Sequence, residues 1–184
     1  MTPPNLNTTI TPRKLTVLPT LLLVLFSFGV QAQSAREYQV KAVFIYNFTR
    51  FTDWPPQSFE SNAPFVIGIL GEDPFGEYID KTVAGETVQG HPMVIRRYRS
   101  ADEVKNCHIL FISKSQDVKN ALAALSNKNT LTVSDCEDFM KMGGMIRLIT
   151  KENKIKLQVN PAAVNASGIS ISSRLLRVAE IWRQ

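Results

Sequence analysis

Acidic and hydroxyl side chains follow three apolar runs of the sequence, each about as long as a strand. In an open α/β sheet, ligands bind in the crevice outside the carboxyl ends of parallel strands. The side chains that would line such a crevice for a small ligand are Glu72, Asp73, Phe75, Ser113, Lys114, Ser134 and Asp135. For the loop 71–76 the alternative interpretation is a plain turn shaped by its proline and glycines.

The loop 71–76 matches neither common phosphate-binding pattern. Glu77 and Tyr78 follow its second glycine where a Walker loop has Lys-Ser/Thr, and the pattern G-x-G-x-x-G is absent. The carboxylates of Glu72 and Asp73 would also repel a phosphate. We therefore expect no nucleotide cofactor at this loop.

The two histidines, His91 and His108, show no pattern of a metal or catalytic site. Neither has a histidine, cysteine or acid at ligand spacing, and no G-x-S-x-G or other nucleophile motif occurs. The acids Glu103, Asp135 and Glu137 are expected to cap helices. We predict no metal, no cofactor and no enzymatic activity, because an enzyme would need a catalytic group of residues that no motif marks.

The two cysteines, Cys107 and Cys136, are expected to remain unpaired. Cys107 precedes the third predicted strand and Cys136 follows the fourth. If these strands are parallel, the cysteines lie at opposite edges of the sheet, about 16 Å apart for a five-residue strand. A disulfide allows at most about 7 Å between Cα atoms.

Aromatic side chains are dense between residues 44 and 54. Core packing accounts for most of them, but they exceed what one helical face can bury, and aromatic side chains are enriched at protein interfaces. The candidate partner-binding residues are Tyr46, Phe48, Phe51 and Trp54.

Residues 1–32 have the order of parts typical of a secretory signal peptide. Arg13 and Lys14 are their only charges, a sixteen-residue apolar run follows, and the segment ends in Val30-Gln31-Ala32, a small-residue cleavage pattern. A membrane-spanning helix needs about 20 apolar residues, so an uncleaved anchor is the weaker alternative. We predict a signal peptide over 1–32, a domain over 33–184 and a periplasmic location.

The charge balance of the exported chain excludes a nucleic-acid role. The whole sequence has a formal net charge of +5, and losing Arg13 and Lys14 lowers it by two. The arginines Arg96, Arg97 and Arg99 are clustered, but they are expected to form a solvated strand end, because nucleic acid is out of reach after export.

The order of predicted elements indicates an α/β fold in a single domain. A long helix is expected over 36–53, and a last helix begins near Ser172 or Ser173. Between them, strands over 65–70, 93–95, 108–112 and 130–133 alternate with helices over 76–83, 100–103, from Ser115 onward and 134–143. We predict a mostly parallel mixed sheet flanked by helices, with an antiparallel edge hairpin over 145–159.

Four segments carry a resemblance to a known family: residues 41–55, 69–76, 107–113 and 169–176. Together they resemble the YfiR-like family of exported bacterial proteins over about 36–182. The resemblance implies a non-enzymatic periplasmic regulator that binds the periplasmic sensor domain of an inner-membrane diguanylate cyclase and restrains its activity. It would thereby lower cyclic di-GMP and restrain biofilm behaviour, with a homodimer as a further expectation.

Two other functions remain open from the sequence: an enzyme, only if a cleft holds titratable groups that hydrogen-bond one another, and a small-ligand sensor. A small-ligand sensor coupled to a membrane histidine kinase would use the crevice described above. Regulatory disulfides occur in some members of the family, but the two cysteines of this sequence depart from that feature because the expected topology keeps them apart.

Overall fold

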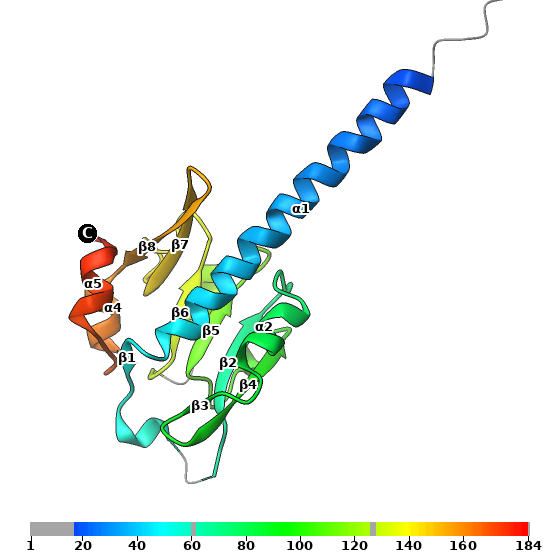
Figure 1. The fold of residues 1–184 in the computed structure, drawn as a ribbon. Coiled ribbons are helices and arrows are strands. Elements are labelled where there is room, and N and C mark those ends of the chain that lie inside the picture. Colours follow the sequence, from blue (N-terminus) through cyan, green and yellow to red (C-terminus); the bar gives the residue numbers. More distant parts are fainter. Residues whose placement is uncertain (1–16, 60–61, 126–127, 184) are drawn as a thin grey trace, which may run out of the picture. The chain divides into compact units, whose positions relative to one another are not determined.

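The computed structural model describes residues 17–59, 62–125 and 128–183. The contacts divide the chain into two units, Met1–Ser34 and Ala35–Gln184. The helix α1, Val17–Phe48, has residues in both units, and the α/β fold belongs to the second (Figure 1). The predicted signal peptide begins in residues 1–16, which lie outside the described residues, and the side chains of residues 17–32 are likewise not described.

The second unit alternates strands with short helices. In chain order they are β1 (Thr52–Asp53), η1 (Pro56–Ser58), β2 (Phe65–Leu70), α2 (Glu77–Val83), β3 (Thr87–Val88), β4 (His91–Tyr98), η2 (Ala101–Glu103), β5 (Ile109–Ile112), α3 (Val118–Ala124), β6 (Leu131–Ser134), β7 (Ile146–Lys151), β8 (Lys154–Val159), α4 (Pro161–Ala166), β9 (Ser170–Ile171), α5 (Ser173–Val178) and β10 (Glu180–Ile181).

Within the described residues, eight strands form one mixed sheet in the order β10-β8-β7-β6-β5-β2-β4-β3. Every neighbouring pair from β4 to β7 is parallel, whereas β7–β8 and β3–β4 are antiparallel. The predicted α/β class, the mostly parallel sheet and the hairpin are therefore confirmed. The hairpin turns at Glu152 and Asn153, both with positive φ, as a two-residue turn matched to the twist of the strands requires.

The central strands are buried on both faces. Every residue of β2 and β5 is buried, which explains their uninterrupted apolar sequences. Gly68 in β2 permits this packing, because a Cβ there would lie 2.8 Å from side-chain atoms of Cys107, Leu110 and Tyr98. Any larger residue at position 68 would force the neighbouring side chains apart.

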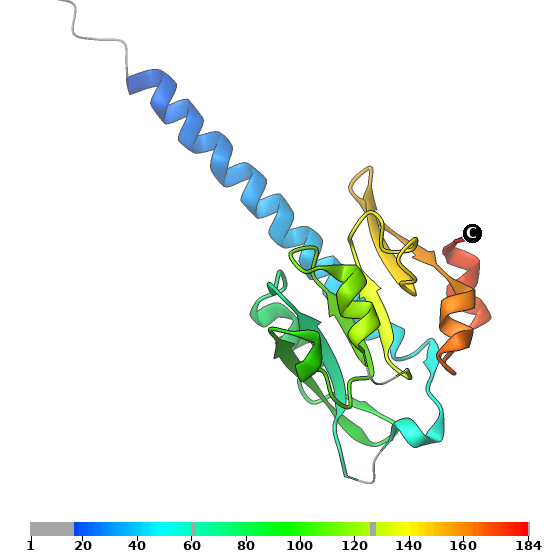
Figure 2. The same ribbon diagram turned by 180° about the vertical axis from the view of Figure 1, so that it is seen from behind.

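Two hydrophobic clusters lie on the two sides of the sheet (Figures 1 and 2). On one side, Ala42, Ile45 and Phe48 of α1 pack with α2 and with residues of α4 and α5. On the other side, α3 and the segment that follows β6 pack against Leu110 and Ile112 of β5. Both faces are thus covered, as a parallel sheet requires.

Two helices end earlier than their apolar patterns predict. The helix expected to reach Asp53 ends at Phe48, because Thr52 and Asp53 pair with β9 instead. The last helix is capped by Ser172, as expected, but ends at Val178. Its expected continuation forms β10, which pairs with β8. In both places the sheet hydrogen bonds override the helical periodicity.

Three predicted helix caps are wrong. Ser134 ends β6 and donates its hydroxyl to the Ile112 carbonyl, so no helix follows it, and residues 137–143 form turns. The cap of α3 is Asp117, whose carboxylate accepts the Asn120 N–H, rather than Ser115. At η2 the Ser100 side chain makes no capping bond, and Glu103 accepts the Arg99 N–H.

Protonation of His108 is expected to destabilise the fold. Its Nδ1 accepts the Val66 N–H at 3.0 Å, its Nε2 donates to the Ser58 carbonyl at 2.9 Å, and its ring stacks on Phe65. Burial lowers the pKa of His108. Its contribution is therefore complete above its unfolded pKa of about 6.5 and is lost as pH falls through the lower folded value.

Urea unfolding between about pH 8 and about pH 5 measures this effect. The variant His108→Gln should lose part of the pH dependence, whereas His91→Gln should keep it. An unchanged pH profile in His108→Gln would contradict the assignment.

Candidate functional site

The first helix is tied to the carboxyl edge of the sheet by a buried ion pair. Lys41 Nζ lies 2.6 Å from Oδ2 of Asp135, the residue directly after β6, and Lys41 is only 2% exposed. Tyr38 donates its hydroxyl to the same Asp135 oxygen at 2.8 Å. Lys41 also contacts Glu37 one helical turn earlier, at 2.6 Å. Asp135 therefore holds the first helix in place. The prediction that Asp135 caps a following helix is wrong.

The same group of residues extends to β7. Thr150 donates its hydroxyl to Glu37 at 2.7 Å. Burial alone would raise the pKa of Glu37, but the hydrogen bonds from Lys41 and Thr150 hold that pKa below its usual value. Burial and the neighbouring Asp135 carboxylate raise the pKa of Tyr38. Tyr38 is accordingly a neutral donor, and the network carries two carboxylates and one ammonium group.

The predicted crevice is closed by aromatic packing at its centre. Phe75 is 6% exposed and packs edge-on against Tyr38 of α1 and Phe111 of β5. Ser134 is fully buried. Among the crevice residues, Lys114 and Glu72 are exposed.

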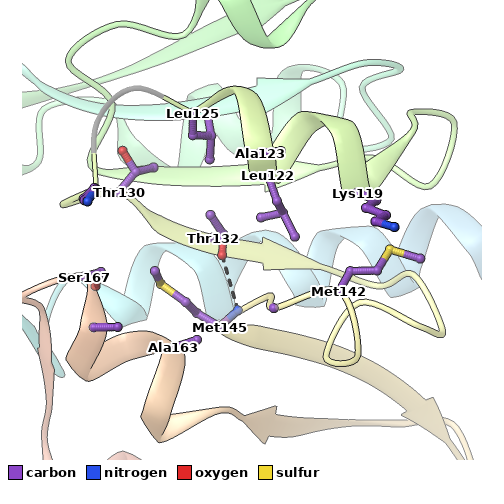
Figure 3. A pocket seen from close by; sticks show the side chains of 13 residues that line it. Lys119, Leu122, Ala123, Leu125, Thr130, Thr132, Met142, Met145, Ala163 and Ser167 are labelled. Atoms are coloured by element: carbon purple, nitrogen blue, oxygen red, sulfur yellow. Dashed lines mark hydrogen bonds between the residues drawn. The ribbon is translucent and has the colours of Figure 1, made fainter.

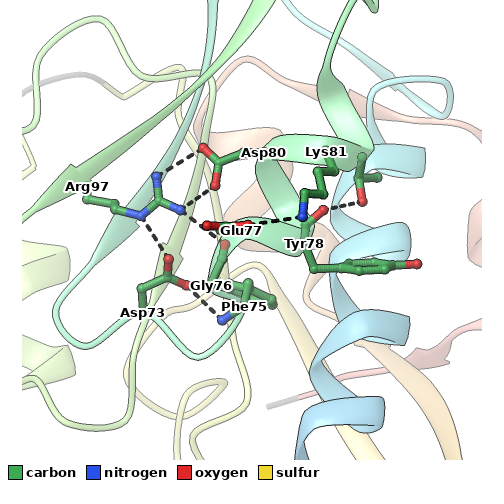
Figure 4. A network of polar contacts seen from close by, with 9 residues as sticks. Asp73, Phe75, Gly76, Glu77, Tyr78, Asp80, Lys81 and Arg97 are labelled. Atoms are coloured by element: carbon green, nitrogen blue, oxygen red, sulfur yellow. Dashed lines mark hydrogen bonds and ion pairs between the residues drawn. The ribbon is translucent and has the colours of Figure 1, made fainter.

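Asp73 binds an arginine instead of facing a ligand (Figure 4). Arg97 of β4 donates to Asp73 at 2.8 Å, to Asp80 of α2 at 2.6 Å and to the Gly76 carbonyl at 3.2 Å. The hydrogen bonds from Arg97 lower the pKa of Asp80. Arg97 lies at a solvent-exposed strand end, as expected, and it also fastens the loop 71–76 and the start of α2 to the sheet.

The topology brings the seven crevice residues to one edge of the sheet, as predicted, but two of their three acids are already bound within the protein. Asp73 pairs with Arg97, and Asp135 pairs with Lys41. The Ser113 hydroxyl accepts the hydroxyl of Ser115 at 3.1 Å. The edge is thus organised to hold α1 and α2.

Two of the four candidate partner-binding aromatics belong to the core, which corrects that prediction. Phe48 is 1% exposed, and Trp54, 5% exposed, donates its indole N–H to the His108 carbonyl. Both are therefore covered by the protein itself. Tyr46 and Phe51 are half-buried, and the Tyr46 hydroxyl donates to Glu86 at 2.6 Å.

Exposed apolar side chains lie instead at other positions of α1 and at the end of α5. Val40 is 47% exposed and Val43 is 38% exposed. Beside them, Phe44 lines a groove of about 350 Å³ together with residues of β8 and Val178, which is 74% exposed. We call Val40, Val43, Phe44 and Val178 the apolar helix surface.

The sequence contained a signal for this surface. The sequence of α1 is apolar on two sides, and such a helix is either deeply buried or shared with another surface. The side with Lys41, Ala42 and Ile45 is the buried one, and Val40 and Val43 are exposed. The buried Lys41 makes this side of the helix look polar in the sequence.

The cysteines occupy the positions that the topology predicted. Cys107 is buried before β5, Cys136 is half-buried after β6, and the two strands pair in parallel. Burial raises the pKa of the Cys107 thiol to about 12. We expect two titratable thiols per chain when the protein is denatured without reductant. A chain with no titratable thiol would contradict the expectation.

Within the described residues, no group of three His, Cys, Asp or Glu side chains is placed to hold a metal ion. No helix in this part of the chain is long and apolar enough to cross a membrane.

The fold defines a single-domain α/β protein with a curled, mostly parallel sheet whose carboxyl edge holds the first helix. A family model described as YfiR/HmsC-like matches residues 38–180, and the chain belongs to this family. The family is known for periplasmic regulators of diguanylate cyclases. No curated protein matches the sequence.

Proposed function

We propose that this protein is an exported, non-enzymatic regulator that binds the periplasmic sensor domain of an inner-membrane diguanylate cyclase and restrains its activity. The family match over residues 38–180 is the observation that carries this proposal. Restraint of the cyclase lowers the production of cyclic di-GMP and so opposes biofilm formation.

Export by a cleaved signal peptide is part of the proposal. The unit that contains the α/β fold begins at Ala35, close to the predicted cleavage after Ala32. The described core residues all lie at Tyr38 or later. A domain that begins at Gln33 therefore retains this core, and the mass of the protein recovered from the periplasm measures the cleavage site.

The apolar helix surface is the structural feature that favours binding of a protein partner. Exposed valines on one face of a helix, beside a groove lined by Phe44 and Val178, form the kind of patch that marks interaction sites on soluble domains. Tyr46 and Phe51 lie along the same segment and remain candidate contacts at its border. We propose that the sensor domain covers Val40 and Val43.

A small-ligand role for the crevice has less support. The carboxylates of Asp73 and Asp135 are bound to Arg97 and Lys41. Phe75 occupies the space between α1 and β5. We therefore do not carry the ligand sensor forward as a second function for this edge.

Direct capture tests the proposal. The exported chain is immobilised and presented with the purified periplasmic domains of the inner-membrane diguanylate cyclases of its own organism, and with histidine-kinase sensor domains as the contrast. We expect saturable binding to a cyclase domain. Failure to bind any cyclase domain, or binding to kinase domains alone, would overturn the proposal. Sedimentation of the same sample measures whether the chain also forms the expected homodimer.

A further inference from the structure

An open groove of about 670 Å³ lies between α3 and α4, over β6 and the start of β7 (Figure 3). Leu122 of α3 and Leu125, directly after α3, form one wall, and Met145 and Ala163 lie on the other. Lys119 and Met142 lie together at one end of the groove, and Thr130 lies at the other. The volume falls within the range of about 300–1,000 Å³ typical of small-molecule sites.

The groove results from the way in which the chain continues after β6. Turns form over 137–143 in place of the predicted helix over 134–143, and Met142 and Gly143 of these turns line the groove. Leu131 and Val133 face the cluster that contains α1. The alternate residues Thr130 and Thr132 therefore form the floor of the groove between α3 and α4.

The lining of the groove contains three hydroxyl side chains, but most of their hydrogen-bonding capacity is used within the protein. The Thr130 hydroxyl donates to the Cys107 carbonyl at 2.7 Å, and the Ser167 hydroxyl donates to the Val164 carbonyl at 2.6 Å. Thr132 Oγ1 accepts the Met145 N–H at 3.3 Å (Figure 3). A sugar or nucleotide needs several convergent donors and acceptors, which such a floor does not supply. It suits an apolar body.

The charges at the groove have one sign. Lys119 on α3 and Lys128 before β6 both line it and are exposed, and its lining contains no acid. Within the described residues, neither lysine takes part in an ion pair. Among the described residues that line the groove, these two lysines carry the only charges, so the groove favours an anionic head group.

We propose that the groove between α3 and α4 binds a fatty acid. The acyl chain lies along Leu122, Leu125 and Met145, and the carboxylate is held at the rim by Lys119 or Lys128. The site is separate from the apolar helix surface, so binding is measurable without any protein partner.

Calorimetric titration of the exported chain with dodecanoate, below the concentration at which it forms micelles, tests the proposal. We expect saturable binding of one molecule per chain. Dodecyltrimethylammonium offers the same chain with a cationic head, and acetate offers the carboxylate without the chain; both should bind at least about tenfold more weakly. Equal binding of the cationic amphiphile would show non-specific adsorption and overturn the proposal.

Matched variants locate the site. Ala166→Trp places an indole in the groove from an exposed position and should abolish binding, whereas Ala162→Trp, in the same helix but outside the lining, should not. The double variant Lys119→Glu/Lys128→Glu should weaken binding roughly tenfold, and Lys151→Glu should leave it unchanged. Thermal unfolding confirms that each variant is folded. Unchanged affinity in folded Ala166→Trp would overturn the proposal, as would unchanged affinity in the double lysine variant.

Discussion

The variant Lys41→Met is expected to lower the free energy of unfolding by about 3–5 kcal/mol, because the Asp135 carboxylate would stay buried without its cationic partner. Both side chains are nearly inaccessible, at 3% and 7% exposure. For a domain of this size the loss corresponds to a fall of roughly 10 °C in Tm. Chemical and thermal unfolding of the exported chain measure both quantities.

A matched control separates the buried pair from lysine loss in general. Lys81 pairs with Glu77 on the surface of α2, with both side chains largely exposed, so Lys81→Met should change stability by no more than about 0.5 kcal/mol. The double variant Lys41→Met/Asp135→Leu should regain part of the stability, since the unpaired carboxylate of Asp135 is gone and the Glu37 carboxylate is partly exposed. Equal stability of Lys41→Met and Lys81→Met would contradict the role assigned to the pair.

The variant Val43→Glu is expected to weaken binding of the sensor domain at least about thirtyfold, which corresponds to about 2 kcal/mol at the centre of an interface. A carboxylate at this position would be desolvated by the partner without a compensating charge. Val43 is exposed in the free chain, so stability should change by no more than about 0.5 kcal/mol. Affinity measurements with the captured cyclase domain give the result.

The control for this variant is Ala124→Glu, which adds the same charge at an exposed position on α3. α3 packs in the cluster on the opposite side of the sheet from α1. Ala124→Glu should bind the partner as the unchanged chain does. Full affinity in Val43→Glu would place the interface elsewhere on the molecule.

Continuous apolar runs made the centre of the fold predictable from sequence. The strand over 65–70 matches β2 residue for residue, and the alternation after residue 154 marks the two-faced hairpin strand β8. Such patterns reflect the burial of the strand directly, so the structure confirms the strands that they predict.

The errors lie where long-range contacts decide the structure. Ser134 was expected to begin a helix, but its side-chain hydroxyl donates to the backbone carbonyl of Ile112 in the neighbouring strand. Phe48 and Trp54 are aromatic residues, a type that is enriched at interfaces. Only their burial in the folded protein shows that they belong to the core. Local sequence does not record which neighbours arrive from distant segments.

The candidate site was predicted in position but not in role. Topology placed Asp73 and Asp135 at one edge of the sheet, as parallel strands require. Their partners, Arg97 and Lys41, are 24 and 94 residues away in the chain, so no short motif connects them. Asp73 and Asp135 are for this reason structural.

Cyclic di-GMP in intact cells tests the central claim most directly. Deleting the gene should raise the nucleotide level through the membrane cyclase, and restoring the unchanged chain should lower it again. Restoring Val43→Glu should leave the level high, although the variant is exported and folded. An unaltered cyclic di-GMP level after deletion, in cells that produce the captured cyclase, would contradict regulation of that enzyme by this protein.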